Sequence, residues 1–506
     1  MNSDRVKLVA LFFFLIFGSL ILGADIFAGG GNQLGRALKW CTLGAALIGL
    51  IFGRYSVLFF VVVLYYLDFV KRLLVLGDGL SLEDVMISLG SGPVIIVAAC
   101  INCTVGAITG KITFGRAMDF AFYIGCVAIS CLGWFVSDGS TFIQKSQDML
   151  GTALIGMTAL ASYCLFRTKE DVRLLIKCMV LAGIPMALYT VWQFVYGIAA
   201  WEEAYIKTGV STVLYNTYVV AGGINEMRPF STLNLHPSVG AASGTMFVLS
   251  VAVMAKSKIC FDRPYQRTFT YWVIGLIYLA SCILCQNRTT YFLPLFYIVF
   301  AWSFRGGLRT LSVYFAGVLA LTLLVLKSEA IYNNILQWSD SFENTSLGSH
   351  FGTLGTYQDR LQGFINLTDG KNWLPFGIDS EHRPWSHDPI SGMIFTMGYV
   401  PFGIALMAAV IGLSWWHSKM LAIKDESTRA LLIRLTAVVA ALGACGVGYG
   451  NLLFVAPVNA FLGALVGVAV SCLRRELQSA PVELEAAEET ASPQNLRADQ
   501  GVLTRS

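Results

Sequence analysis

Long apolar runs make up most of this sequence, and they limit the folds open to it more than any other feature. Between its charged residues we count about fourteen runs long enough for a bilayer-crossing helix, which takes roughly 20 residues. Charged residues form only 13% of the 506 residues, whereas soluble proteins carry about 25%, so they cannot cover a soluble surface of this size. We therefore predict an all-α, polytopic integral membrane protein with about 12–14 transmembrane helices and two long outer loops.

Most of the runs match the length of one crossing. The run 388–416 is longer and contains Gly398, so we expect a short leading helix there, followed by a full span. The approximate limits of all the runs are 8–24, 38–53, 55–70, 89–110, 117–136, 149–166, 174–196, 237–255, 270–286, 290–304, 310–326, 388–416, 431–449 and 452–472.

Two long polar segments interrupt the runs, and both keep aromatic residues that disordered linkers lack. We expect them to be folded and to hold the functional site. The predicted order along the chain is N-terminal transmembrane helices at 1–196, a first outer loop with Arg228 at 197–236, central transmembrane helices at 237–326, a large outer loop at 327–387, C-terminal transmembrane helices at 388–476, and a disordered cytoplasmic tail at 477–506.

Lysine and arginine are distributed unevenly between the two sides of this topology. When the spans alternate from a cytoplasmic N-terminus, the short inner connections hold most of the basic residues, and the reverse orientation would place them outside. Both long loops then lie on the outer side. Lys71 and Arg72 are exceptions to the pattern, since they also fall on the outer side.

Several classes of function are disfavoured by composition. The formal charge of +4 is spread thinly and forms no basic face, so we expect no nucleic-acid partner. The twelve cysteines lie in or beside apolar runs, which indicates helix packing rather than a disulfide framework. The five histidines show no paired spacing typical of zinc sites, so we predict no metal and no cofactor.

His387 has the most informative context of the histidines. Asp388 is a favourable helix N-cap, and Pro389 suits the first helical position. His387 would then stand near the positive end of a membrane helix, which keeps an imidazole neutral, as a general base requires. The same context also fits a histidine that only packs at a helix start, and both interpretations remain open.

Three arginines are predicted on the same outer face. Arg228 precedes a span, Arg288 lies in a tight turn between two spans, and Arg360 lies in the second long loop. An arginine near hydrocarbon depth costs roughly 2.5–3.5 kcal/mol and usually has a partner. Headgroup phosphates or a phosphate-bearing ligand would supply that partner, because guanidinium groups match phosphate oxygens. Together with His387, the arginines favour a group transfer in which diphosphate is the leaving group.

Six short motifs, taken in order, resemble the bacterial O-antigen ligase and O-antigen polymerase superfamily of polytopic inner-membrane glycosyltransferases. The similarity covers roughly residues 200–450. The motifs are Arg228-Pro229-Phe230-Ser231-Thr232-Leu233-Asn234, Asn287-Arg288-Thr289-Thr290, Arg360-Leu361-Gln362-Gly363-Phe364, Trp373-Leu374-Pro375-Phe376-Gly377-Ile378, His387-Asp388-Pro389-Ile390 and Gly398-Tyr399-Val400-Pro401-Phe402-Gly403.

The resemblance implies transfer of a glycan from a polyprenyl (undecaprenyl) diphosphate carrier to an acceptor hydroxyl on the periplasmic face of the inner membrane. Such an enzyme makes cell-surface polysaccharide without a metal or a nucleotide sugar. Its partners would be the carrier-linked glycan, a glycan or lipid acceptor and membrane lipids, and a chain-length regulator is a further candidate partner.

The resemblance also implies roles for particular residues. Arg228, Arg288 and Arg360 would hold the diphosphate and stabilise its developing charge. His387 would take the proton from the attacking hydroxyl, with inversion at the sugar carbon. Tyr357, Trp373 and Trp385 would stack on sugars or, as we favour for each, pack within the loop. The remaining candidate accessory residues are His236 and Asp388.

Two activities compete within this interpretation. A polymerase joins carrier-linked repeat units, whereas a ligase attaches the finished chain to lipid A core. The number of spans and the length of the chain slightly favour the polymerase. A secondary transporter or lipid-glycan flippase is an alternative of another class, although ionisable residues are few at midspan and no repeat between halves is visible.

Overall fold

The structure of the chain is a computed structural model. The structure describes residues 33–76, 82–109, 117–136, 142–211, 214, 228–233, 235–256, 265–285, 287–306, 366–367, 372, 374–378, 389–448 and 452–490.

All regular structure in these ranges is helical, and no strand occurs in them. Seven of the helices are long and apolar enough to cross a membrane, and three shorter apolar helices accompany them. The predicted all-α, polytopic membrane class is therefore confirmed, while the predicted number of 12–14 spans stays a prediction. The expected spans 8–24 and 310–326 lie outside the described residues.

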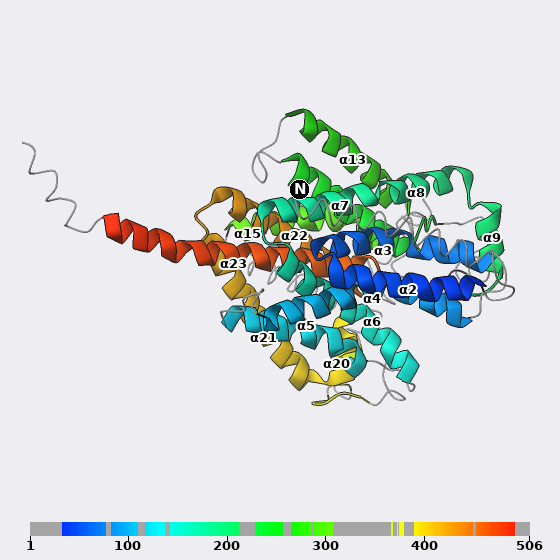
Figure 1. The fold of residues 1–506 in the computed structure, drawn as a ribbon, viewed down its shortest axis with the longest axis horizontal. Helices are drawn as coiled ribbons and strands as arrows, with labels where there is room; N and C mark the ends of the chain where they lie inside the picture. Colours follow the sequence, from blue (N-terminus) through cyan, green and yellow to red (C-terminus); the bar gives the residue numbers. More distant parts are fainter. Residues whose placement is uncertain are drawn as a thin grey trace, which may run out of the picture.

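The helices form a bundle whose axes run mostly side by side (Figure 1). In chain order they are α2 (Gln33–Ile51), α3 (Arg54–Leu76), α4 (Leu82–Ile108), α5 (Ala117–Val136), α6 (Phe142–Leu165), α7 (Lys169–Ala182), α8 (Ile184–Tyr196), α9 (Ala200–Lys207), α11 (His236–Val248), the π-helical η3 (Leu249–Ala255), α13 (Tyr265–Leu284), α14 (Arg288–Tyr291), α15 (Leu293–Gly306), α20 (Pro389–Met397), α21 (Tyr399–Leu421), α22 (Glu426–Gly448), the short 3₁₀ turn η5 (Leu452–Phe454) and α23 (Val458–Thr490).

Small residues let the central helices approach one another closely. On α23, Gly463 and Gly467 face α6, and a Cβ atom at either position would lie within 2.3 Å of a backbone oxygen of α6. This spacing of four residues is the small-residue pattern typical of packed membrane helices. The continuous helix formed by α11 and η3 is buried over 83% of its apolar window, so it lies in the core of the bundle.

Helix α21 lies at the periphery, and its apolar window has no buried residue. It exposes large aliphatic side chains such as Met407 and Ile411, as expected for a surface that faces lipid. The chain turns sharply between α20 and α21 at Gly398, which has φ 87°. The predicted short leading helix followed by a full span is therefore confirmed.

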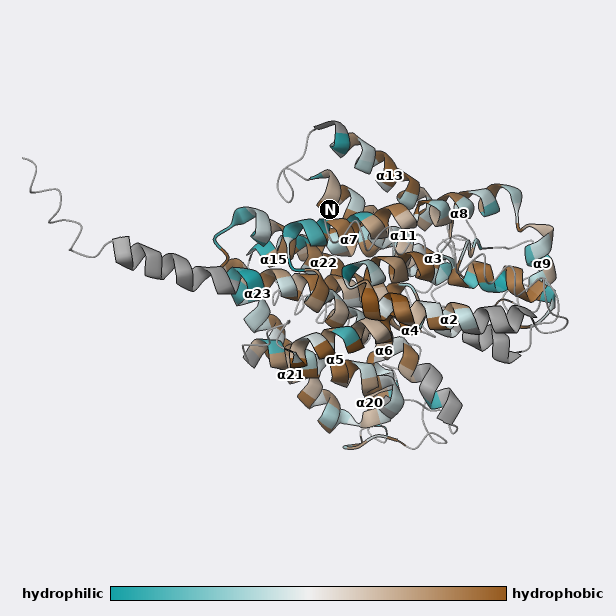
Figure 2. Ribbon diagram, viewed as in Figure 1, coloured by the Kyte–Doolittle hydropathy of each residue, from teal (hydrophilic) through white to brown (hydrophobic). Residues whose placement is uncertain are grey.

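Basic residues are more numerous at one end of the bundle, which carries Arg54, Lys169, Arg173 and Arg474 among others, than at the other, which carries Lys71, Arg72 and Lys207. Figure 2 shows hydrophilic residues gathered towards the helix ends. At one end, here called the basic end, α3 begins and α23 passes Arg474. At the other, the α9 end, α3 and α8 finish and the short helix α9 crosses them (Figure 1). Three ion pairs join helices at the basic end: Arg54–Asp171, Lys169–Asp425 and Arg474–Asp119.

Candidate functional site

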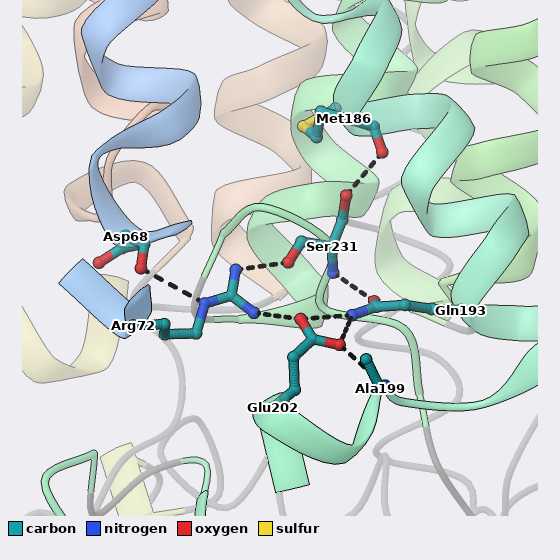
Figure 3. Close-up of polar contacts among 7 residues, drawn as sticks. All are labelled: Asp68, Arg72, Met186, Gln193, Ala199, Glu202 and Ser231. Atoms are coloured by element: carbon teal, nitrogen blue, oxygen red, sulfur yellow. Dashed lines mark hydrogen bonds and ion pairs between the residues drawn. The ribbon is translucent and has the colours of Figure 1, made fainter. Parts of the chain in front are cut away.

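A fully buried ion pair joins α3 to α9 at the α9 end. The last turns of α3 carry Asp68, Lys71 and Arg72, and Lys71 pairs with Asp68 on the same helix. Arg72 has no exposed surface, and its Nη1 lies 2.8 Å from Oε1 of Glu202, which is equally buried (Figure 3). A buried charge requires such a partner. The two exceptions to the predicted charge distribution are therefore both paired, Lys71 within its own helix and Arg72 with a distant residue of α9.

The Glu202 carboxylate is further satisfied by hydrogen bonds from two other donors. Gln193 Nε2 on α8 donates to both oxygens, at 3.0 and 2.9 Å, and the Ala199 N–H donates at 3.4 Å. Burial raises the pKa of Glu202 above its ordinary value, while Arg72 and Gln193 act in the opposite direction. The carboxylate is therefore held by three elements at once, which makes this end of α9 rigid.

The same network holds the segment 228–233, which contains Arg228. Arg72 Nη2 donates to the carbonyl oxygen of Ser231 at 2.5 Å, and the Ser231 N–H donates to Gln193 Oε1 at 2.7 Å. The Ser231 hydroxyl donates to the carbonyl oxygen of Met186 at 2.6 Å. Ser231 adopts φ 52°, a strained conformation for a residue other than glycine, which persists only where surrounding contacts enforce it.

Arg228 opens this segment and is exposed. It lies close enough to act electrostatically on the side chains of His236 and Cys285. His236 is the first residue of α11, and Cys285 directly follows α13. The chain then turns and begins α14 at Arg288. The structure thus brings the predicted residues Arg228 and His236 to the turn that carries the Arg288 backbone.

Close packing between α11 and this turn depends on Gly240. A Cβ atom there would lie 2.4 Å from Thr290 Oγ1 and 2.7 Å from Cys285 Sγ. The turn itself is held by Asn287, whose side chain accepts a hydrogen bond from the Thr290 N–H at 3.3 Å. Arg288 therefore starts from a backbone position fixed against the first turns of α11. We call the segment 228–233, the first turns of α11 and the 285–290 turn the arginine corner.

Three buried hydroxyl groups at or beside this corner have no hydrogen-bond partner in the described part of the chain. They belong to Thr232, to Ser238 on the first turn of α11, and to Tyr205 on α9. Tyr205 packs against Phe230 of the segment in one small apolar cluster. A buried hydroxyl without a partner destabilises the folded state by about 1–3 kcal/mol. A polar ligand bound at the corner would supply hydrogen-bond partners and so remove part of this penalty.

The segment 374–378 lies against the break between α20 and α21. A Cβ atom on Gly398 would approach the carbonyl oxygen of Pro375 to 2.3 Å, so only glycine fits. The backbone groups freed by the break are thereby satisfied, as membrane helices require. The hydrogen bonds are Ile378 N to Phe395 O at 2.7 Å, Tyr399 N to Leu374 O at 3.1 Å and Val400 N to Pro375 O at 3.3 Å.

The remaining predicted site residues lie outside the described residues: Tyr357, Arg360, Trp373, Trp385, His387 and Asp388. Pro389 is the first residue of α20, as predicted from the capping pattern, and α22 contacts both α20 and α14. Helix α22 therefore connects the arginine corner to the helix that follows His387.

Sequence reasoning missed the Arg72–Glu202 network as part of the site. The one available signal was that Lys71 and Arg72 breached the predicted charge distribution. Within the described residues no group of His, Cys, Asp or Glu side chains is arranged to hold a metal ion. No family model, curated protein or solved structure matches the chain.

Proposed function

We propose that this chain is a membrane glycosyltransferase of the O-antigen ligase and polymerase type. It would transfer a glycan from a polyprenyl diphosphate carrier to an acceptor hydroxyl during synthesis of a cell-surface polysaccharide. The observation that carries the proposal is the arginine corner, where the Arg228 segment, His236 and the Arg288 turn pack around the first turns of α11.

The uneven distribution of basic residues between the two ends supports the orientation. Basic residues concentrate on the cytoplasmic side of membrane proteins, so the basic end would lie in the cytoplasm of a bacterium. The α9 end, with the arginine corner, would then face the periplasm at the outer surface of the inner membrane. A diphosphate attached to a lipid tail lies at this membrane surface while its tail stays in the bilayer.

The chemistry of the corner suits a diphosphate. Guanidinium groups bind phosphate oxygens through paired, charge-assisted hydrogen bonds and retain their charge at any physiological pH. Arg228 is exposed, and the unpaired hydroxyls of Thr232 and Ser238 belong to the same arginine corner. We propose that Arg228, Arg288 and Arg360 bind the diphosphate, with the hydroxyls as additional donors.

The proposed reaction is a direct displacement. The acceptor oxygen attacks the anomeric carbon of the donor sugar, forming a new C–O bond with inversion. The bond between that carbon and the diphosphate oxygen breaks, and the diphosphate leaves with the electron pair, stabilised by the arginines. His387, two residues before α20, takes the proton of the acceptor hydroxyl.

Within this class we slightly favour a polymerase over a ligase that uses lipid A core. A secondary transporter or flippase is the second candidate, because broken helices such as α20–α21 and buried charges such as Arg72 also build transport sites.

A reconstitution separates these functions. Purified protein in liposomes receives a labelled polyprenyl-diphosphate oligosaccharide, first alone and then with a lipid A-core acceptor. A ladder of longer carrier-linked glycans without acceptor indicates a polymerase, and product formed only with acceptor indicates a ligase. Label that crosses the bilayer without covalent change would overturn the enzyme proposal.

The role of His387 is tested by comparing two histidine variants, one at the proposed catalytic position and one at the basic end. His387→Ala should abolish transfer. His417→Ala removes a histidine whose Nε2 lies 3.1 Å from the Phe304 carbonyl oxygen, at the basic end, and should leave transfer intact in the folded protein. Equal loss in both variants would contradict the role of His387.

A further inference from the structure

Arg228 is joined to the buried network by a short and stiff stretch of chain. Only Pro229 and Phe230 separate it from Ser231, and the ring of proline fixes its own φ. Phe230 has no exposed surface, and its ring lies under the Arg72 guanidinium with the two centres 4.8 Å apart. Displacement of Ser231 would therefore carry Arg228 with it.

Within the described residues, Gln193 and Arg72 both bond to the segment and to Glu202 of α9, and Arg72 is the one that does so as a charged donor. It donates to the Ser231 carbonyl oxygen and to the Glu202 carboxylate through different nitrogens, and its Nε faces the Asp68 carbonyl oxygen at 3.3 Å. A planar guanidinium can serve three acceptors in fixed directions, and an ammonium group on a flexible stem cannot. The segment has no helix or strand of its own that would otherwise fix it.

We infer that Arg72 is a positioning residue for diphosphate binding: from within the bundle it fixes the place of the Arg228 guanidinium. The inference rests on the proposed function and extends it, because Arg72 is fully buried and would act on the diphosphate only through the segment. Glu202 accepts a hydrogen bond from Arg72, and Gln193 accepts one from the Ser231 N–H, so both residues help to hold the segment in place.

The test uses farnesyl diphosphate, a short prenyl diphosphate, as the binding probe for the full chain in detergent. Arg72→Lys keeps the positive charge but loses the planar guanidinium group that donates to three acceptors in fixed directions. We expect its affinity for the probe to fall by about tenfold or more, the effect of one misplaced charge-assisted contact. Arg228→Gln should weaken binding similarly, and Arg72→Lys should add little on that background, because both substitutions remove the same interaction.

Arg474→Lys is the matched control. Arg474 pairs at 3.2 Å with the buried Asp119, so the substitution disturbs a comparable ion pair at the basic end. Hydrogen exchange of the peptide 228–235 should accelerate in Arg72→Lys and not in Arg474→Lys. If Arg72→Lys does not fold, Gln193→Met replaces it, since methionine keeps the volume and removes the acceptor for the Ser231 N–H.

The outcomes separate the two claims. If the wild type does not bind the probe, the proposed function is contradicted and the inference falls with it. If the wild type binds and folded Arg72→Lys binds equally well, the inference alone is overturned. Equal weakening in Arg72→Lys and Arg474→Lys would also overturn it, because it indicates a general loss of stability. Additive losses with Arg228→Gln would overturn it too, because they indicate that Arg72 and Arg228 act independently.

Discussion

The Arg72 guanidinium donates to the Ser231 carbonyl oxygen across 2.5 Å, and this contact joins the end of α3 to a segment 159 residues further along the chain. The segment carries Arg228, one of the three arginines that the proposed function places on the diphosphate. The place of a surface arginine is therefore determined by a buried one, through backbone rather than through a direct side-chain contact.

The Arg72–Glu202 pair should show strong coupling in stability measurements. Arg72→Met leaves the Glu202 carboxylate buried without a cation, and Glu202→Gln leaves the guanidinium unpaired. Each should destabilise the protein by about 3–5 kcal/mol, whereas the double variant should lose less than the sum. Unfolding in mixed micelles measures all three, and additive losses would show that the charges do not interact.

Removing a hydroxyl that has no hydrogen-bond partner at the arginine corner should raise the stability of the protein but weaken its binding of the ligand. Thr232→Val deletes a buried, unpaired hydroxyl, so the ligand-free protein should gain about 1 kcal/mol or more. The same variant should bind farnesyl diphosphate more weakly. Thr158→Val removes another orphan hydroxyl, on α6, and should stabilise without weakening binding. Unchanged binding in Thr232→Val would mean that this hydroxyl does not meet the ligand.

Gly240→Ala should disturb the arginine corner without unfolding the bundle. The added methyl group would meet Thr290 Oγ1 and Cys285 Sγ at 2.4 and 2.7 Å, so these two side chains, and the Arg288 turn that carries them, must shift. We expect glycan transfer to fall at least about tenfold, as misplacement of positioning groups does. Gly244→Ala, one turn further along, meets its neighbours at 3.5 Å or more and should retain transfer. A Gly240→Ala variant with full activity would contradict the role of this packing.

Alanine substitutions at two glycines of one sequence motif should change the stability of the protein in opposite directions. Gly398 has φ 87° and touches Pro375, so Gly398→Ala should cost roughly 1–3 kcal/mol from backbone strain alone. Gly403 lies within α21 with open space around it, and Gly403→Ala should stabilise by about 0.5–1 kcal/mol. Thermal unfolding in detergent measures both. Equal effects would show that the break at Gly398 is not fixed by the segment 374–378.

Asp425 at the basic end should contribute stability that depends on pH. Burial alone would raise the pKa of this carboxyl, but hydrogen bonds from Lys169, Thr428 and Ser427 hold it well below its ordinary value. A lowered pKa stabilises the folded state above the unfolded-state pKa, near 4, and the contribution is lost as the pH falls below that value. Asp425→Asn should therefore unfold more easily than the wild type between pH 5 and pH 8, by about 1 kcal/mol for a partly exposed helix cap. The difference should shrink below about pH 4, and a constant difference would contradict this assignment.

Much of the fold could be predicted because membrane helices are encoded locally. Apolar runs set the helices, Gly398 marked the break, and Pro389 marked the start of α20. The pairing of Arg72 with Glu202 joins residues 130 positions apart, and no local pattern connects them. The sequence predicts that Arg228 and Arg288 share one face, but the approach of α11 to the Arg288 turn depends on the tertiary contact at Gly240, which no local pattern indicates.

A cryo-EM structure of the protein in nanodiscs with undecaprenyl-diphosphate oligosaccharide would show whether a prenyl diphosphate binds at the arginine corner. We expect the diphosphate at the α9 end, with its oxygens about 3 Å from the guanidinium groups of both Arg228 and Arg288. A diphosphate bound at the basic end, or one at the α9 end that does not contact Arg228, would contradict this expectation.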